Sequence, residues 1–175
     1  MPMHKTTAEL EATLPEILAA PLDAGPIELI VRRPAEDQRE TVESAALDPD
    51  MGLVGDNWKS RGASSPASQL TLMSSRVAAA MADRDRWPLA GDQIYVDLNL
   101  STTNLPPGTR LRVGEATIEI SPMAHNGCAK FAARFGKEAL RFANVGEGKA
   151  NRFRGVYAFV VEGGRFGVGD KVTKL

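Results

Sequence analysis

The chain has 175 residues, a net charge of −1 and 43% hydrophobic residues, which is typical of one folded domain with a substantial core. So small a net charge creates no global field for nucleic acid or for an anionic membrane surface, and we expect neither as a partner. No apolar run reaches membrane-spanning length, and Met1 to Glu16 lacks the charged-then-apolar order of a secretory signal. A single cysteine cannot form an internal disulfide, which agrees with a reducing compartment. We therefore expect a cytoplasmic protein.

The N-terminal half predicts a helical extension followed by strands and loops. Thr6 to Glu9 has the spacing of a helix cap and Pro15 interrupts the helical pattern behind it, so residues 1–25 are expected to form a short helical extension. Strands are expected at 27–33 and, with weaker alternation, at 39–47. Residues 52–57 are expected to form a glycine-bracketed loop and residues 61–68 an exposed loop. A strand at 69–73 should lead into a helix over 76–82 that Ser74 or Ser75 caps.

The C-terminal half shows a more regular strand pattern. Residues 94–100 alternate as in a half-buried strand, and residues 110–113 and 116–120 form a hairpin in which Gly114 supplies the positive φ of the turn. Residues 144–149 are expected to be a loop, and strands at 155–161 and 166–172 flank a turn. Short strands with glycine turns and few helices predict a mostly β (α+β) protein, a compact β-barrel in a single domain covering 1–175.

The stretch from His125 to Phe131 contains the only cysteine of the chain and one of its two histidines. Asn126 is expected to cap a helix, which would place Cys128 at the second helical position among unpaired backbone amides. Lys130 adds a positive charge, and His125 is close enough to exchange a proton. Such surroundings favour a thiolate that acts as a nucleophile or a metal ligand.

The segment after Cys128 has two faces if it is helical, although Gly136 interrupts it. One face is apolar, with Phe131, Phe135 and Phe142, and the other carries lysines and arginines. Because Cys128 projects beside the phenylalanines, we expect its thiol at the rim of an apolar pocket. The alternatives are a cysteine buried as a small hydrophobic residue, a histidine that only makes loop hydrogen bonds, and a basic face that is merely solvated.

Other chemistries find little support in the sequence. One cysteine and two distant histidines cannot make a structural zinc site. No phosphate-binding loop, dinucleotide fingerprint or Gly-x-Ser-x-Gly elbow is present in the sequence. The thiol is therefore the principal candidate for function.

An ordered set of short motifs resembles the MOSC domain, the family named for the C-terminus of molybdenum cofactor sulfurases. The resemblance spans residues 52–172. Its motif stretches are 52–56 (GLVGD), 69–73 (QLTLM), 97–101 (DLNLS), 105–114, 127–131 (GCAKF), 154–157 (RGVY) and 161–170. The chain departs from the usual pattern in having Asn57 and Trp58 after the Gly-Asp pair, and Gly127 rather than proline before the cysteine.

The resemblance implies a barrel-rich fold with an exposed cysteine in a cleft. It implies that Cys128 accepts sulfur as a persulfide from a cysteine desulfurase-like donor and passes it to a metal-cofactor acceptor protein. It also makes Cys128 a possible molybdenum ligand, with molybdopterin as the cofactor, whereas pyridoxal phosphate would belong to the partner desulfurase. Asp56, Asn99, Lys130 and Arg154 match motif positions and are further candidates for the cleft, together with His125.

The family leaves alternatives open. Relatives of this kind include molybdenum-dependent reductases of N-hydroxylated compounds, and the same pocket could serve a non-catalytic module that binds a small ligand. We expect a sulfur-carrier protein with Cys128 as the working residue.

Overall fold

A computed structural model describes residues 3–61 and 64–175 of the chain. Within these residues, seven strands close into a barrel because β1 pairs with β11, and β2 extends the sheet beyond β1. In the order in which they pair, the barrel strands are β11 (Lys171–Lys174), β7 (Arg110–Val113), β8 (Ala116–Ile120), β9 (Val156–Glu162), β5 (Leu70–Ser74), β6 (Ile94–Val96) and β1 (Ala24–Arg32). Only the β5–β6 pair is parallel among the described strands. The expectation of a mostly β, barrel-containing protein is confirmed.

The barrel is filled by the branched aliphatic side chains that alternate along its strands. Ile27 and Ile30 of β1, Ile118 of β8 and Ala158 of β9 are among the fully buried members of this core. The hairpin β7–β8 has the predicted bounds, and Gly114 adopts a φ of +57°, the positive value that its turn requires. Apolar alternation with period two therefore decides which face of each strand points inward.

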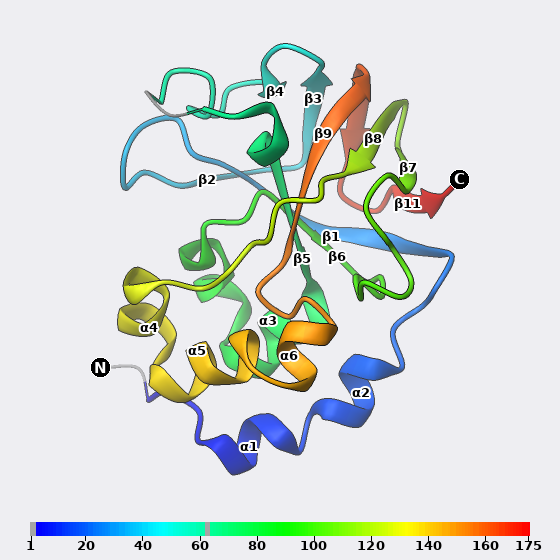
Figure 1. The fold of residues 1–175 in the computed structure, drawn as a ribbon. Coiled ribbons are helices and arrows are strands. Elements are labelled where there is room, and N and C mark those ends of the chain that lie inside the picture. The colour runs from blue at the N-terminus through cyan, green and yellow to red at the C-terminus, as the bar shows by residue number, and fades with distance from the viewer. Residues whose placement is uncertain (1–2, 62–63) are drawn as a thin grey trace.

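A small second sheet lies at one end of the barrel (Figure 1). It consists of β10 (Gly164–Gly167), β3 (Ser44–Asp48) and β4 (Gly52–Leu53), with β3 in the middle. The single strand expected over 39–47 is wrong, because the chain leaves the barrel edge after β2 (Glu40–Val42) and enters the small sheet as β3. Likewise β4 occupies the first residues of the loop expected at 52–57.

The helices gather at the other end of the molecule (Figure 1). They are α1 (Thr7–Glu11), α2 (Leu14–Leu18), α3 (Ser75–Met81), α4 (Ala129–Phe135), α5 (Lys137–Asn144) and α6 (Glu147–Ala150), with the 3₁₀ segment η2 (Arg84–Ala90). A second 3₁₀ segment, η1 (Pro66–Ser68), lies directly before β5, near the small sheet (Figure 1). Their apolar sides meet the outside of the barrel in a second core, in which Leu10, Met73, Tyr95 and Phe131 are buried. Among the described residues, no helix has the length and apolar character needed to cross a membrane.

The N-terminal extension behaves as expected where it is described, and Met1 and Pro2 lie outside the described residues. Thr6 and Glu9 form a reciprocal capping box, and Pro15 stands in the first turn of α2 after a break in the helix. Ser74 is the residue that caps α3, through its hydroxyl group. Of the loop expected at 61–68, residues 62 and 63 lie outside the described part, and η1 occupies its end.

Three further expectations need correction. The strand expected over 166–172 is two strands, because β10 ends at Gly167 in the small sheet and β11 begins at Lys171 in the barrel. The strand expected over 94–100 ends at Val96, although Leu98 and Leu100 beyond it stay buried in the barrel core. The loop expected at 144–149 contains most of α6, a single helical turn whose side chains are mainly exposed. Hydrophobic periodicity does not show whether a buried residue is paired in a strand, and it does not detect a short polar helix.

Candidate functional site

Cys128 is exposed and forms the N-cap of α4, so it is the residue before the helix rather than the second helical residue. Asn126 therefore does not cap the helix. The loop after β8 carries the cysteine to this position, and Phe131 and Phe135 anchor α4 in the helix-side core. The predicted break at Gly136 is confirmed, because its φ of +98° separates α4 from α5. The thiol is thus fixed at the open end of an anchored helix.

A side-chain clamp holds the backbone immediately before the cysteine. The amide of Asn144, the last residue of α5, accepts a hydrogen bond from the Gly127 N–H at 2.9 Å and donates one to the Gly127 carbonyl at 3.2 Å. A Cβ atom at position 127 would lie 2.5 Å from Leu140 Cδ1, so a larger residue there would require the Leu140 side chain to move. The Asn144 amide thus fixes the backbone of the residue next to the cysteine.

The surroundings of Cys128 lower the pKa of its thiol. The largest contribution comes from the backbone N–H of Phe131 in the open first turn of α4; the Lys130 N–H and the charges of Arg154 and Arg134 add to it, whereas partial burial opposes it. The Cys128 side chain makes no capping hydrogen bond, so the backbone amides stabilise the thiolate mainly through their electrostatic field. A lowered pKa increases the thiolate fraction at neutral pH, as a nucleophile or a metal ligand requires.

A cavity of about 630 Å³, here called the basic cavity, opens beside this cysteine. Its lining comes mainly from the loop after β1, from the segment before and around η1, and from α4. The charged side chains in the lining are Arg33, Glu36, Asp37, Arg39, Arg61, Lys130, Arg134 and Arg154. Six cations against two carboxylates give the lining an excess of positive charge, which favours an anion over a cation as a ligand. Cys128 is not part of the lining, but His125 and Lys130 on either side of it are.

Two arginines of the basic cavity are held by buried carboxylates. Arg33 donates to Asp56 from Nε and Nη2, both at 2.9 Å, and Asp56 also accepts from the backbone N–H groups of Arg33 and Trp58. Burial acts to raise the pKa of Asp56, but the hydrogen bonds and charge of Arg33 outweigh it and hold that pKa below its usual value. Asp56 therefore stands behind the cavity wall and orients Arg33.

Arg154 is fixed in a similar way. It forms an ion pair with the fully buried Asp92, donates to the Ala90 carbonyl at 2.8 Å, and lies 4.9 Å from the ring centroid of Phe131. Asp92 follows η2, and Phe131 belongs to α4. Arg154 thus connects the barrel wall to the helix that carries the thiol.

His125 is a buried, neutral member of the same wall. Its ring stacks on Tyr157 with centroids 4.3 Å apart, and burial, with help from the charges of Arg154 and Arg33, lowers its pKa to about 4. Its Nδ1 lies 3.7 Å from Asp92 Oδ1, and neither atom has a hydrogen-bond partner among the described residues. A Cβ at Gly155 would lie 3.0 Å from Asp92 Oδ1 and 3.2 Å from His125 Nδ1, so glycine allows the backbone to pass close to these two buried polar atoms.

The predicted site residues divide into three groups. Lys130, Arg154 and His125 line the basic cavity beside Cys128, and Asp56 supports it from behind. Asn99 lies elsewhere: its side chain accepts from the Ser101 N–H in the loop after β6, and it is not part of the cavity lining. Sequence reasoning missed Arg33, Asp92, Asn144 and Tyr157, which reach the site from four separate segments; the proximity of Tyr157 to Arg154 in one motif was the only signal for any of them.

The residues present fit an anionic molybdenum cofactor. Among the described residues, no group of three or more histidine, cysteine or acidic side chains could hold a metal ion, and Cys128 is the one residue of the chain that can supply a thiolate ligand. The remaining ligands would have to come with the cofactor. A cavity of this size lined by arginines and a lysine suits the phosphate of such a cofactor.

Comparison with known proteins identifies the family. The MOSC domain profile matches residues 60–173, which is more than half of the chain. Solved structures with the same fold include YiiM from Escherichia coli (20% identity, 86% of this chain and 69% of that chain, TM-score 0.57). The YUAD protein from Bacillus subtilis is also similar (17% identity, 85% and 94% coverage, TM-score 0.58).

YiiM from Geobacillus stearothermophilus shares the fold as well, at 15% identity, with 86% of this chain and 73% of that chain covered and a TM-score of 0.55. A search of the curated proteins found no match. At these identities the solved structures show the fold alone. Together with the family match, they establish that the chain belongs to the MOSC domain family.

Proposed function

We propose that this protein is a sulfur carrier in which Cys128 accepts sulfur as a persulfide. The observation that carries the proposal is an exposed thiol of lowered pKa beside a cavity lined by six cationic side chains. The two alternatives for the cysteine, an inert buried residue and a reactive thiol, differ in exposure, and the exposed position of Cys128 supports the second. The family match supports the same reading.

The sulfur-accepting step needs no external oxidant. The Cys128 thiolate attacks the terminal sulfur of a persulfide on the donor protein. A new S–S bond forms at Cys128, the S–S bond of the donor breaks, and the cysteine of the donor leaves as a thiolate. The first-turn amides of α4 and the charges of Arg134 and Arg154 stabilise the attacking thiolate. The donor is a cysteine desulfurase-like enzyme that carries its own pyridoxal phosphate, and the acceptor is a metal-cofactor protein.

The test is sulfur acceptance by Cys128→Ser. Native protein incubated with a cysteine desulfurase and cysteine should gain one sulfur by intact-mass analysis, and dithiothreitol should remove it. The variant should gain none, while its melting temperature stays close to that of the native protein because the side chain is exposed. Equal sulfur gain in the two proteins, or none in either, would refute the proposal.

A second candidate is a molybdenum-dependent reductase of N-hydroxylated compounds, and the charge of the basic cavity favours it. Lys130, Arg134 and Arg154 would hold the anionic part of the cofactor and Cys128 would ligate the metal. A bound molybdenum centre would supply two-electron reduction. This reading requires molybdenum and pterin to co-purify in near-stoichiometric amounts after expression with adequate cofactor supply.

Loss of that molybdenum in Cys128→Ser would support the reductase over the sulfur carrier. Slow, ordinary alkylation of Cys128 with neither metal nor sulfur bound would instead favour a non-catalytic module that binds a small ligand in the basic cavity. Mass and metal analysis of the native protein thus separates the three readings.

A further inference from the structure

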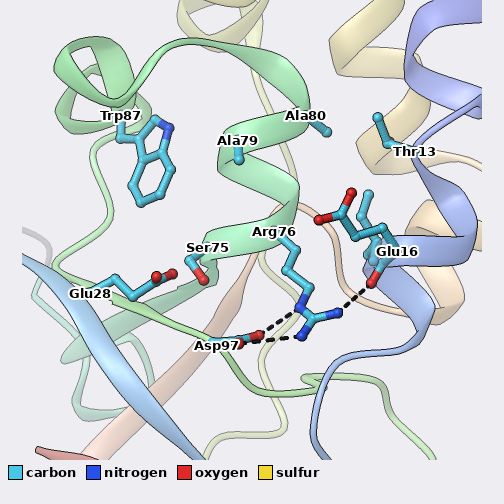
Figure 2. Close-up of a pocket in the computed structure, with 10 residues that line it drawn as sticks. Thr13, Glu16, Glu28, Ser75, Arg76, Ala79, Ala80, Trp87 and Asp97 are labelled. Atoms are coloured by element: carbon cyan, nitrogen blue, oxygen red, sulfur yellow. Dashed lines mark hydrogen bonds and ion pairs between the residues drawn. The ribbon is translucent and has the colours of Figure 1, made fainter. Parts of the chain in front are cut away.

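A second cavity, here called the α2–α3 pocket, lies between α2, α3 and β1 (Figure 2). Its volume is about 380 Å³, and none of its lining residues also lines the basic cavity. The lining consists of Thr13, Glu16, Ile17, Glu28, Ser75, Arg76, Ala79, Ala80, Trp87 and Asp97. The sulfur-carrier proposal assigns no role to this pocket.

The α2–α3 pocket contains three carboxylates and one cation. Arg76 donates to Asp97 from Nε at 2.7 Å and to the Glu16 backbone carbonyl at 2.8 Å, so its guanidinium group is already engaged (Figure 2). The hydrogen bond to Asp97 raises the pKa of Arg76, and the charges of Glu16 and Glu28 act in the same direction. Among the described residues, neither Glu16 nor Glu28 forms an ion pair of its own. The lining therefore carries three carboxylates against one cation, a net charge of −2.

A buried hydroxyl group in the same pocket lacks a partner. Ser75 is 2% exposed, and its Oγ makes no hydrogen bond to any described residue. Figure 2 shows Ser75 at the start of α3, with Glu28 extending toward it from β1 and the Trp87 ring directed into the same space. A buried polar group without a hydrogen-bond partner lowers the stability of the folded protein. A ligand that forms a hydrogen bond with this hydroxyl group would remove that cost.

We propose that the α2–α3 pocket binds a small aliphatic diamine. Two ammonium groups match the net charge of −2, since Glu16 and Glu28 form no ion pair among the described residues, and an ammonium N–H can donate to the unpaired Ser75 Oγ. The methylene stem would pack on Ile17, Ala80 and Trp87. An anion finds no free cation here, and the described residues contain no cluster of three metal-ligating side chains, so neither an anion nor a metal ion fits as well. The inference goes beyond the proposed function and does not depend on it.

Isothermal titration calorimetry with putrescine tests the proposal. Native protein at low salt should bind one equivalent saturably, and Glu28→Gln should weaken binding about tenfold, the loss expected for one charged hydrogen bond. Ser75→Ala should weaken it as well. The control is Glu11→Gln, which removes an exposed negative charge from α1 outside the pocket and should bind like the native protein.

Three further results decide the outcome. Butylamine, which has a single ammonium group, should bind more weakly than putrescine, and Cys128→Ser should bind putrescine normally, since the two cavities share no residue. The melting temperature of each variant shows that it is folded. Absence of saturable binding would overturn the proposal. Equal weakening by Glu28→Gln and Glu11→Gln would also overturn it, because it would show only general charge attraction.

Discussion

At the scale of single residues, the reactivity of Cys128 depends on groups that the helix and the cavity bring to it. The sequence argument predicted a lowered thiol pKa from helix amides and a neighbouring lysine, and the structure agrees on the direction. The contributors differ in part: the Phe131 amide comes first, and Arg154 and Arg134 replace the Lys130 side chain as the cations that matter. Lys130 acts on the sulfur through its backbone N–H.

Replacing Arg134 should therefore raise the thiol pKa. Arg134→Gln removes one of the two cations that stabilise the thiolate, so alkylation of Cys128 by iodoacetamide should become slower at neutral pH and its pH profile should move upward. Arg141→Gln is the matched control, since Arg141 is an exposed arginine of α5 that does not affect the thiol pKa. Equal shifts in the two variants, or none, would contradict this account.

At the scale of elements, α4 and α5 act together as a support for the thiol. Gly136 breaks the helix so that Phe131 and Phe135 of α4 and Ala139 and Ala143 of α5 can all reach the helix-side core. The end of α5 then returns to Gly127 through Asn144. One short helix presents the cysteine and the next one restrains its approach.

Removing this clamp should loosen the cysteine segment. Asn144→Ala loses two half-buried hydrogen bonds, which at about 1 kcal/mol each predicts about 2 kcal/mol lower free energy of unfolding in urea titrations. Backbone amide exchange at Gly127 and Cys128 should also be faster. In the control Asn151→Ala, only exposed bonds to Glu147 are lost, so stability should change by less. A loss in Asn144→Ala no larger than in the control would argue against the clamp.

At the scale of the whole molecule, the wall of the basic cavity joins segments from the entire chain. His125 after β8 faces Asp92 after η2, Arg154 and Tyr157 around the start of β9, and Arg33 after β1. The barrel closes these distant segments around one site. The burial of His125 in this wall predicts that the stability of the protein depends on pH.

Stability should fall between pH 6.5 and about pH 4. The ordinary pKa of histidine is 6.5 and that of His125 in the folded protein is about 4, so in this interval the unfolded chain binds a proton that the folded protein does not. The free energy of unfolding should thus decrease as the pH falls, by up to about 3 kcal/mol.

Urea unfolding of the native protein and of His125→Gln across this interval measures the effect. The slope with pH should be shallower in His125→Gln, whereas His4→Gln, which removes an exposed histidine, should keep the native slope. Identical slopes for the native protein and His125→Gln would show that His125 does not carry the acid sensitivity.

Much of the barrel follows from local signals. The hairpin at Gly114 and the strand around Ala158 were predicted with nearly their observed bounds, because alternating apolar residues and a glycine turn act over a few neighbours. The split of residues 39–47 into β2 and β3 was not predictable in this way, since it depends on β10, more than a hundred residues later, pairing with β3.

The sequence by itself determined the fold class, the family and the identity of the thiol. The cysteine and the family motifs around it can be recognised from the sequence because each motif is contiguous in the chain. Only the tertiary structure decided what surrounds that thiol: Asn144 against Gly127, Asp56 behind Arg33, and Asp92 beneath Arg154. The α2–α3 pocket has the same origin, since its carboxylates belong to α2, β1 and the segment after β6. Closing a barrel brings such residues together through long-range pairing, and no local pattern records which charges will then face each other.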